Sequence, residues 1–359
     1  MEKLTRSLFL LSAEYPAEVQ PPPLQRSSSN NGHQNNMQGT LMALQDVEQR
    51  YPVKLNQYCK KLTEHSNAAK KMYLPDEKEL ETCGLSDDGL GEIAQMPVPK
   101  FIRRYTDRAV LLCTDKCFVH CRFCFRKRQW RSDALPMNLS DEELNAVCNW
   151  LDLNHEVTDI LLSGGDIMTL PDERIIEIAS RIRASGNVSS VRICSRAPAV
   201  DPERITDHIA EKLADIEGLW FVTHFNHPDE LTPEAHEACR KLIRHGIPVL
   251  DQTVLLAGIN DDPETLKTLF KTLVSWRVKP HYLFHVDPIE GVAHFATGVQ
   301  KGLDILKDFQ LSLSSLATPA FAIDLPCGGG KLILTAAEKN DKGEWFSPVH
   351  KRFIRHPLT

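Results

Sequence analysis

The strongest constraint on the fold is a repeated alternation of short apolar runs with segments of helical periodicity, which begins near residue 97. Six runs rich in β-branched residues recur, at residues 109–114, 159–163, 190–195, 219–223, 249–256 and 282–286. Strands that alternate with helices pair in parallel, because a parallel pair needs a crossover connection. Six units are fewer than the eight of a closed barrel. We therefore predict an α/β fold, a partial (β/α)6 TIM-like barrel over residues 97–325.

The segments between the runs carry the signals of helix starts. Apolar residues between 144 and 151 recur at helical spacing, and Ser140 with Glu143 three residues later matches a capping box. A second segment, residues 266–274, follows Asp262 and Pro263, an N-cap residue and a favoured first-turn residue. Both patterns predict helices between strands.

The rest of the chain divides into three parts. Residues 1–40 are polar and rich in Pro, Ser, Asn and Gln, so we expect a disordered leader. Residues 41–96 form a helical N-terminal region, with helical stretches at 41–50 and 57–71. Residues 326–359 form a C-terminal segment that begins with a glycine-rich loop.

The composition excludes several classes of protein. The chain has 359 residues, of which 42% are hydrophobic and 25% charged, as in an ordinary globular enzyme. Its net charge of −6 argues against nucleic acid as a partner. No apolar run reaches the roughly 18 residues of a membrane span, and residues 8–11 are too short for a signal-peptide core. We expect a cytoplasmic protein with no membrane partner.

A C-x3-C-x2-C array, Cys117, Cys121 and Cys124, follows the first predicted strand. Three thiolates can hold three irons of a cubane iron–sulfur cluster and leave the fourth iron open, whereas an electron-transfer cluster usually has four cysteines. The alternative is a structural zinc site, which needs a fourth ligand. No second C-x2-C follows, and His120 is an awkward candidate for that ligand. The array favours the cluster and leaves zinc open.

Other polar motifs also follow predicted strands, whose carboxyl ends share one edge of a parallel barrel. Ser163, Gly164, Gly165 and Asp166 follow the second strand, and glycines there allow a close backbone approach to a ligand. After the fourth strand, residues 223–228 include His224 and His227, which are interpreted either as pocket lining or as structural hydrogen-bonding groups. The shared edge predicts one common site.

The last motif is a glycine run that precedes Lys331 and follows a further apolar segment, residues 320–324. It is not a phosphate-binding P-loop, because Leu332 stands where that motif needs Ser or Thr. A lysine on a flexible glycine-rich loop suits pyridoxal 5′-phosphate (PLP), since the amine forms an imine with this cofactor. A solvated surface lysine is the alternative.

Taken together, these motifs resemble the lysine 2,3-aminomutase family of radical S-adenosylmethionine (SAM), PLP-dependent enzymes. The array, with Phe123 before its last cysteine, resembles the radical SAM signature. The other blocks that carry the resemblance are residues 104–108, 161–166, 195–198, 223–228, 252–256, 294–295 and 326–331. The resemblance implies a partial barrel of the radical SAM type and an isomerase.

The resemblance also implies the cofactors and their residues. Cys117, Cys121 and Cys124 would hold a 4Fe-4S cluster whose fourth iron SAM chelates. Lys331 would be the catalytic lysine that carries PLP. The other cofactor-binding positions that it implies are Arg104 and Arg108, on the PLP phosphate, and Ser163, Gly164, Gly165, Asp166, His224, Gln252 and Phe123.

Three residues would bind the substrate. Arg126 would take its carboxylate as a fork-like pair. Asp287 and Asp324 match the two carboxylates that recognise the distal amino group of lysine. Two adjacent buried carboxylates need a countercharge, so glutamate is disfavoured as a substrate.

The implied reaction converts L-lysine to β-lysine by a 1,2-amino shift. One alternative is an arginine 2,3-aminomutase or an enzyme acting on a related basic amino acid. An enzyme that modifies a lysine for a translation factor is more distant, since it lacks a matching context for the lysine of the glycine run. The alternative of another class is a non-catalytic iron–sulfur or zinc-binding protein. We expect an amino acid substrate, an electron donor such as flavodoxin or ferredoxin, and a homo-oligomer.

The chain departs from the family in two places. No cysteine follows Cys327, whereas well-known lysine aminomutases carry a cysteine-rich, zinc-binding tail. A structural zinc is therefore not expected here. Cys327 itself lies in the glycine run, where the family usually has glycine.

Overall fold

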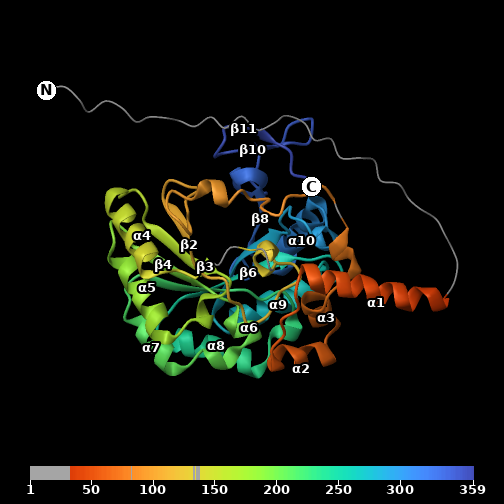
Figure 1. Cartoon of the computed structure of the whole chain (residues 1–359), viewed down its shortest axis with the longest axis horizontal. Helices are drawn as coiled ribbons and strands as arrows, with labels where there is room; N and C mark the ends of the chain where they lie inside the picture. Colours follow the sequence, from red (N-terminus) through yellow and green to blue (C-terminus); the bar gives the residue numbers. More distant parts are fainter. Residues whose placement is uncertain (1–32, 82, 132–133, 135–137) are drawn as a thin grey trace.

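A single curled sheet of nine strands organises the chain (Figure 1). The computed structural model describes residues 33–81, 83–131, 134 and 138–359. The strands lie in the sheet in chain order: β1 (Phe101–Ile102), β2 (Arg108–Thr114), β3 (Asp159–Gly164), β4 (Ser190–Cys194), β5 (Leu219–Thr223), β6 (Val249–Leu255), β7 (Val278–His285), β8 (Ala320–Leu325) and β9 (Gly330–Ile333). Strands β2 to β8 pair in parallel, and β1 and β9 pair antiparallel at the two edges.

Helices follow each of the strands β2 to β7, which confirms the six predicted strand–helix units. The α-helices are α4 (Asp141–Leu153), α5 (Asp172–Ala184), α6 (Ala197–Val200), α7 (Asp207–Ala214), α8 (Pro233–Arg244), α9 (Pro263–Ser275) and α10 (Val299–Ser312). Short 3-10 helices lie among them: η3 (Lys127–Trp130), η4 (Ile167–Thr169), η5 (Pro202–Arg204), η6 (Pro228–Glu230) and η7 (Ala293–Phe295). Figure 1 shows α4, α5, α7 and α8 on the outer side of the sheet.

The predicted helix starts are confirmed. The Ser140 hydroxyl accepts a hydrogen bond from the Glu143 N–H, and the Glu143 carboxylate accepts one from the Ser140 N–H. Asp262 caps α9 through the N–H of Thr265, with Pro263 at the first helical position. These caps satisfy N–H groups that have no partner inside a helix.

Alternate strand residues are buried under the helices. In β3, Ile160 and Leu162 are fully buried, whereas Asp159, Leu161 and Ser163 are half-buried. Successive strand residues point to opposite faces. The concave face of the sheet is therefore the one that presents polar groups, and the convex face supplies the core.

The N-terminal region is helical, as predicted, but its boundaries differ. It contains α1 (His33–Arg50), α2 (Gln57–His65), α3 (Asn67–Tyr73), η1 (Glu77–Leu80) and η2 (Ile93–Gln95). The boundary predicted at residue 40 falls inside α1. A helix that has formed over residues 41–50 extends easily towards its N-terminus, because each added residue forms one more hydrogen bond without a new nucleation step. The rest of the predicted leader, residues 1–32, lies outside the described residues. The helix predicted over 57–71 is broken at Ser66, whose hydroxyl caps α3.

The C-terminal segment differs from the predicted flexible loop. After η8 (Pro326–Gly328), Lys331 lies in β9, which forms an antiparallel hairpin with β8 and pairs Lys331 with Asp324. Gly328 and Gly330 have φ of +76° and +94°, which glycine adopts at little cost and which closes this tight turn. A separate pair, β10 (Trp345–Ser347) and β11 (Arg352–Ile354), lies above it (Figure 1). No helix among the described residues is long and apolar enough to cross a membrane.

Candidate active site

The cysteine array lies in the loop after β2, with hydrogen-bond donors beside two of its thiols. Arg196 Nη1 is 2.7 Å from Cys121 Sγ, and the Arg126 N–H donates to Cys124 Sγ at 3.4 Å. Burial raises the pKa of Cys124 to about 11, and it also raises that of Cys121 although Arg196 opposes the rise. Thiolates are the form that binds metal. Positive and N–H groups aimed at sulfur therefore suit a site that holds metal-bound thiolates.

The zinc alternative gains no support from the array's surroundings. Among the described residues, no three His, Cys, Asp or Glu side chains are placed to hold one metal ion. His120 bonds through Nδ1 to the Pro52 carbonyl at 2.7 Å and stacks on Trp130 at 4.4 Å. Each cysteine of a cubane binds a different iron, so a cluster does not require three sulfurs around one point. The donor set fits the cluster.

The glycine motif joins the array loop to the next two strands. The Gly165 N–H donates to the Thr114 carbonyl at 2.6 Å, and the Asp166 N–H donates to the Lys116 carbonyl at 2.7 Å. A Cβ on Gly165 would lie 2.3 Å from the Lys116 carbonyl oxygen, so no side chain fits there. Both N–H groups are thus engaged within the chain, and the SAM contact predicted for this motif stays a prediction.

The Asp166 carboxylate points to the end of β4. It accepts hydrogen bonds from Ser195 Oγ at 2.7 Å and from the Arg196 N–H at 2.9 Å, and burial raises its pKa to about 6. These bonds fix the backbone from which Arg196 reaches Cys121. Asp166 therefore holds Arg196 in the position from which it contacts the cysteine array.

Three other predicted cofactor residues lie on different elements: Phe123 on the array loop, His224 directly after β5 and Gln252 within β6. Phe123 packs against His224 with ring centroids 5.7 Å apart. His224 Nε2 bonds to Asn226 Oδ1 at 3.0 Å, and burial lowers its pKa to about 3, so the ring is neutral. Gln252 lies in β6 and pairs with Tyr282 of β7. His227 instead caps η6 through Nδ1, which favours its structural interpretation.

Lys331 lies among aromatic rings beside a carboxylate. Its Nζ is 4.5 Å and 4.1 Å from the ring centroids of Tyr282 and Phe284, and 3.9 Å from Asp324 Oδ2. The Lys331 N–H donates to the Tyr105 hydroxyl at 2.6 Å. Burial lowers the pKa of Lys331, against the opposing effect of the two nearby aspartates. An amine that loses its proton more easily is a better nucleophile, so this lysine fits a covalently bound carbonyl cofactor.

The two predicted substrate carboxylates lie beside this lysine. Burial, followed by the charge of Asp324, raises the pKa of Asp287 to about 8. Arg104 Nη1 lies 3.3 Å from Asp324 Oδ1, so this predicted phosphate ligand also balances the pair. Arg108 stacks on the Tyr105 ring at 3.7 Å and pairs with Asp107. The structure thus brings Asp287, Asp324 and Lys331 together.

Arg126, the predicted ligand of the substrate carboxylate, is held by a residue that the sequence did not single out. Its Nε and Nη2 donate to the Glu92 carboxylate at 3.1 and 2.7 Å. Its Nη1 lies 3.3 Å from both Ser163 Oγ and the Gly164 carbonyl. Glu92 lies outside the repeated strand pattern and belongs to no motif. The one sequence signal that could have pointed to Glu92 is its position shortly before the matched block at residues 104–108.

Replacing Asp287 with asparagine is expected to stabilise the ligand-free protein at neutral and higher pH. The pKa of Asp287 is about 8 in the folded state, whereas an aspartate in an unfolded chain ionises near pH 4. Its contribution to stability is therefore complete below pH 4 and is lost as the pH rises towards 8. D287N should exceed the wild type by at least about 1 kcal/mol at pH 8, with no such gain at pH 4. Urea unfolding at both pH values checks this, and an equal difference at both would contradict it.

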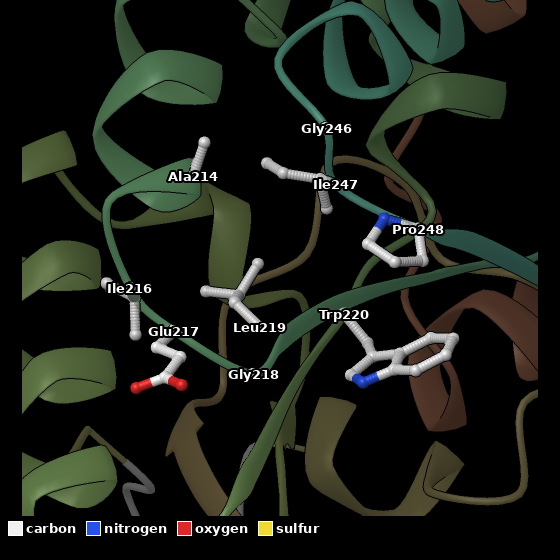
Figure 2. Close-up of a pocket in the computed structure, with 9 residues that line it drawn as sticks. All are labelled: Ala214, Ile216, Glu217, Gly218, Leu219, Trp220, Gly246, Ile247 and Pro248. Carbon is white, nitrogen blue, oxygen red and sulfur yellow. The ribbon is translucent and has the colours of Figure 1, made fainter.

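One pocket lies away from this site (Figure 2). Its volume is about 330 Å³, and it is lined by residues 214, 216–220 and 246–248, at the amino ends of β5 and β6. It contains none of the predicted site residues. Most of the predicted site residues lie at or near the opposite, carboxyl ends of the strands, but Arg108 is the first residue of β2, at its amino end.

Comparison with known proteins agrees with this arrangement. The profile of the radical SAM superfamily matches residues 111–269. A protein of Aquifex aeolicus, provisionally named L-lysine 2,3-aminomutase, is 39% identical over 266 residues, which cover 73% of this chain and 71% of that protein. The L-lysine 2,3-aminomutase of Fusobacterium nucleatum is 42% identical over 246 residues, 68% of this chain and 57% of its own. A glutamate 2,3-aminomutase of Clostridioides difficile is 35% identical over 274 residues, 76% and 64% of the two chains.

The fold and the cysteine array define a radical SAM enzyme. Within that class, the chain belongs to the lysine 2,3-aminomutase family, whose members are isomerases. It spans only 57% of the Fusobacterium protein and 64% of the Clostridioides protein. Membership of the radical SAM class implies an iron–sulfur cluster and SAM.

Proposed function

We propose that this chain is a PLP-dependent 2,3-aminomutase that converts L-lysine to β-lysine. The observation that carries the proposal is the cluster in which Lys331 lies 3.9 Å from Asp324 and beside Asp287. The two aspartates of this cluster lie at the same edge of the sheet as the cysteine array, at the ends of β7 and β8. In this proposal, Lys331 would hold the cofactor, the two acids would bind a distal ammonium group, and the array would generate the radical that acts on the same substrate.

When bound, the cluster and SAM would supply a carbon radical, and PLP would carry the migrating amino group. The chain's own residues hold the reactants. Lys331 would attach PLP, and Cys117, Cys121 and Cys124 would hold the cluster. The rings of Tyr282 and Phe284 place apolar surface beside the Lys331 amine, and 24% of the lysine side chain stays exposed.

The negative charges of Asp287 and Asp324 would favour a substrate whose side chain ends in a cation. Without a ligand, the raised pKa of Asp287 shows that the two acids do not both ionise readily. A lysine ammonium between them would favour the ionised pair, since an opposite charge within about 4–6 Å lowers a carboxyl pKa. A glutamate side chain would add a third carboxylate, so the proposal favours lysine although a glutamate 2,3-aminomutase is among the relatives. At the other end of the substrate, Arg126 would hold the α-carboxylate.

The test is anaerobic reconstitution with iron, sulfide, PLP, SAM and a reductant, followed by separate incubation with lysine, arginine and glutamate. We expect β-lysine from lysine and little or no product from the other two. A β-amino acid from arginine alone would transfer the proposal to the arginine 2,3-aminomutase alternative. No β-amino acid from any of the three would contradict an aminomutase function and favour a binding protein.

The remaining partners follow from this proposal. Radical formation needs one electron, so we propose an electron donor such as flavodoxin or ferredoxin, and a reducing compartment, the cytoplasm. The predicted homo-oligomer also stays a proposal. Its state in solution is measurable by light scattering of the reconstituted protein.

A further inference from the structure

We infer that Glu92 is a positioning residue, which holds one edge of the Arg126 guanidinium so that the other edge is presented to the carboxylate of an amino acid ligand. The inference rests on the proposed function for the identity of that ligand. It concerns how the chain recognises the α-carboxylate, and it gives a role to a residue outside every matched motif.

Glu92 lies on a segment, residues 86–95, that we call the strap. The strap is tied to both loops that carry the predicted substrate and PLP residues. The Cys327 N–H donates to the Gly89 carbonyl at 2.8 Å, beside the turn that leads to Lys331. A Cβ on Gly89 would lie 2.2 Å from the Pro288 carbonyl oxygen, one residue after Asp287. The strap therefore packs closely on the end of the proposed substrate pocket.

The hydrogen bonds of Arg126 divide its guanidinium into two edges. Glu92 takes the edge formed by Nε and Nη2, with distances of 3.1 and 2.7 Å. On the other edge, Nη1 donates longer hydrogen bonds to Ser163 Oγ and to the Gly164 carbonyl, each at 3.3 Å. A guanidinium has five N–H donors in a fixed plane, and a carboxylate binds two of them side by side. The edge at Nη1 faces the end of β3, and a ligand carboxylate that takes this edge would replace the two longer bonds of Nη1 rather than those to Glu92.

Burial makes this arrangement rigid. The side chains of Arg126 and Glu92 are 9% and 4% exposed, and Glu92 also accepts a bond from Arg128 Nη2 at 3.0 Å. Three residues further along the strap, Gln95 Oε1 accepts from Arg104 Nε at 2.8 Å. One short segment thus orients an arginine at each end of the proposed pocket, and a planar fork loses less entropy on binding when it is already fixed.

A rival interpretation makes the opposite prediction. If Glu92 instead stood in for the ligand carboxylate, it would compete with the substrate, and removal of its charge would tighten binding. If it only held the strap in place, its removal would weaken all ligands alike. Lysine and cadaverine (1,5-diaminopentane) distinguish these cases, because they differ only in the α-carboxylate.

The experiment measures equilibrium binding of both ligands to protein loaded with cluster, SAM and PLP but given no reductant. Ligand binding is followed by the visible absorbance of PLP. For Glu92→Gln we expect the Kd of lysine to rise at least about tenfold, the scale of a lost hydrogen bond to a charged group. The Kd of cadaverine should change by less than about threefold.

Asp87→Asn is the matched control. It removes one negative charge from the same strap, but Asp87 pairs with Arg131 at 2.6 Å rather than with Arg126. We expect this variant to bind both ligands as the wild type does. Equal weakening of lysine and cadaverine by E92Q, or tighter lysine binding, would overturn the inference alone. A wild type that binds no α-amino acid would overturn the proposed function, and the inference with it.

Discussion

Replacing Lys331 with alanine is expected to abolish both the attachment of PLP and the formation of β-lysine. Lys331 Nζ is the amine that lies within 4.5 Å of both aromatic rings and beside Asp324. Removing a covalent catalytic group typically costs more than about a thousandfold in rate. We therefore expect activity at the detection limit and no visible absorbance from protein-bound PLP. Iron content should stay at the wild-type level, because the cysteine array is on a different loop.

Lys339→Ala provides the control for this variant. Lys339 lies in the same C-terminal segment but is exposed, with its Nζ 4.7 Å from the Trp345 ring. The K339A variant should bind PLP and iron as the wild type does and should keep its activity. Retention of covalently bound PLP by K331A would contradict the assignment of Lys331.

Replacing Glu79 with glutamine is expected to be the most destabilising of the changes considered for this chain. Glu79 is fully buried and pairs with two buried cations: Arg122 Nη2 lies 2.6 Å and Lys127 Nζ 2.5 Å from Oε2. Removing the charge of one partner leaves buried cations without a countercharge, which typically costs about 3–5 kcal/mol. Denaturant unfolding measures this loss.

The same change should also reduce iron loading. Arg122 lies in the cysteine loop, between Cys121 and Cys124, and its backbone N–H donates to the Met72 carbonyl at 2.8 Å. Because Glu79 pairs with the side chain of Arg122, it connects the N-terminal region to the cysteine loop. The control is Glu77→Gln, on the same turn but exposed, which should change stability by less than about 0.5 kcal/mol. A loss below about 1 kcal/mol for E79Q would show that the buried triad does not hold the loop.

The strands and most helices could be predicted from the sequence because their signals are local. Apolar runs such as residues 219–223 match β5 at both ends, and the capping box at Ser140 and Glu143 marks the start of α4. β7 begins at Val278, four residues before its predicted start. Its register with β6 shifts between Pro280 and Tyr282, and Pro280 interrupts the apolar pattern on which the prediction relied. Parallel pairing with neighbours in chain order then follows from the crossover helices.

What could not be predicted depends on contacts between distant parts of the chain. The glycine run indicated a loop for Lys331, whereas the free edge of β8 pairs with residues 330–333 and draws the lysine into a strand. Glu92 and Arg126 are 34 residues apart in sequence, and no periodicity connects them. The roles of Arg104, Arg108 and Arg126 came only from the family resemblance and stay predictions.

In the function proposed for this chain, the array, Lys331 and the paired aspartates act on one lysine molecule and move its amino group. The most direct measurement uses L-lysine labelled with 15N at the α-amino group, incubated anaerobically with the fully loaded enzyme and a reductant, and analysed by NMR. We expect product in which the label lies on Cβ, with none released to solvent. Label that stays on Cα in all of the amino acid, or that appears as free ammonium, would contradict it.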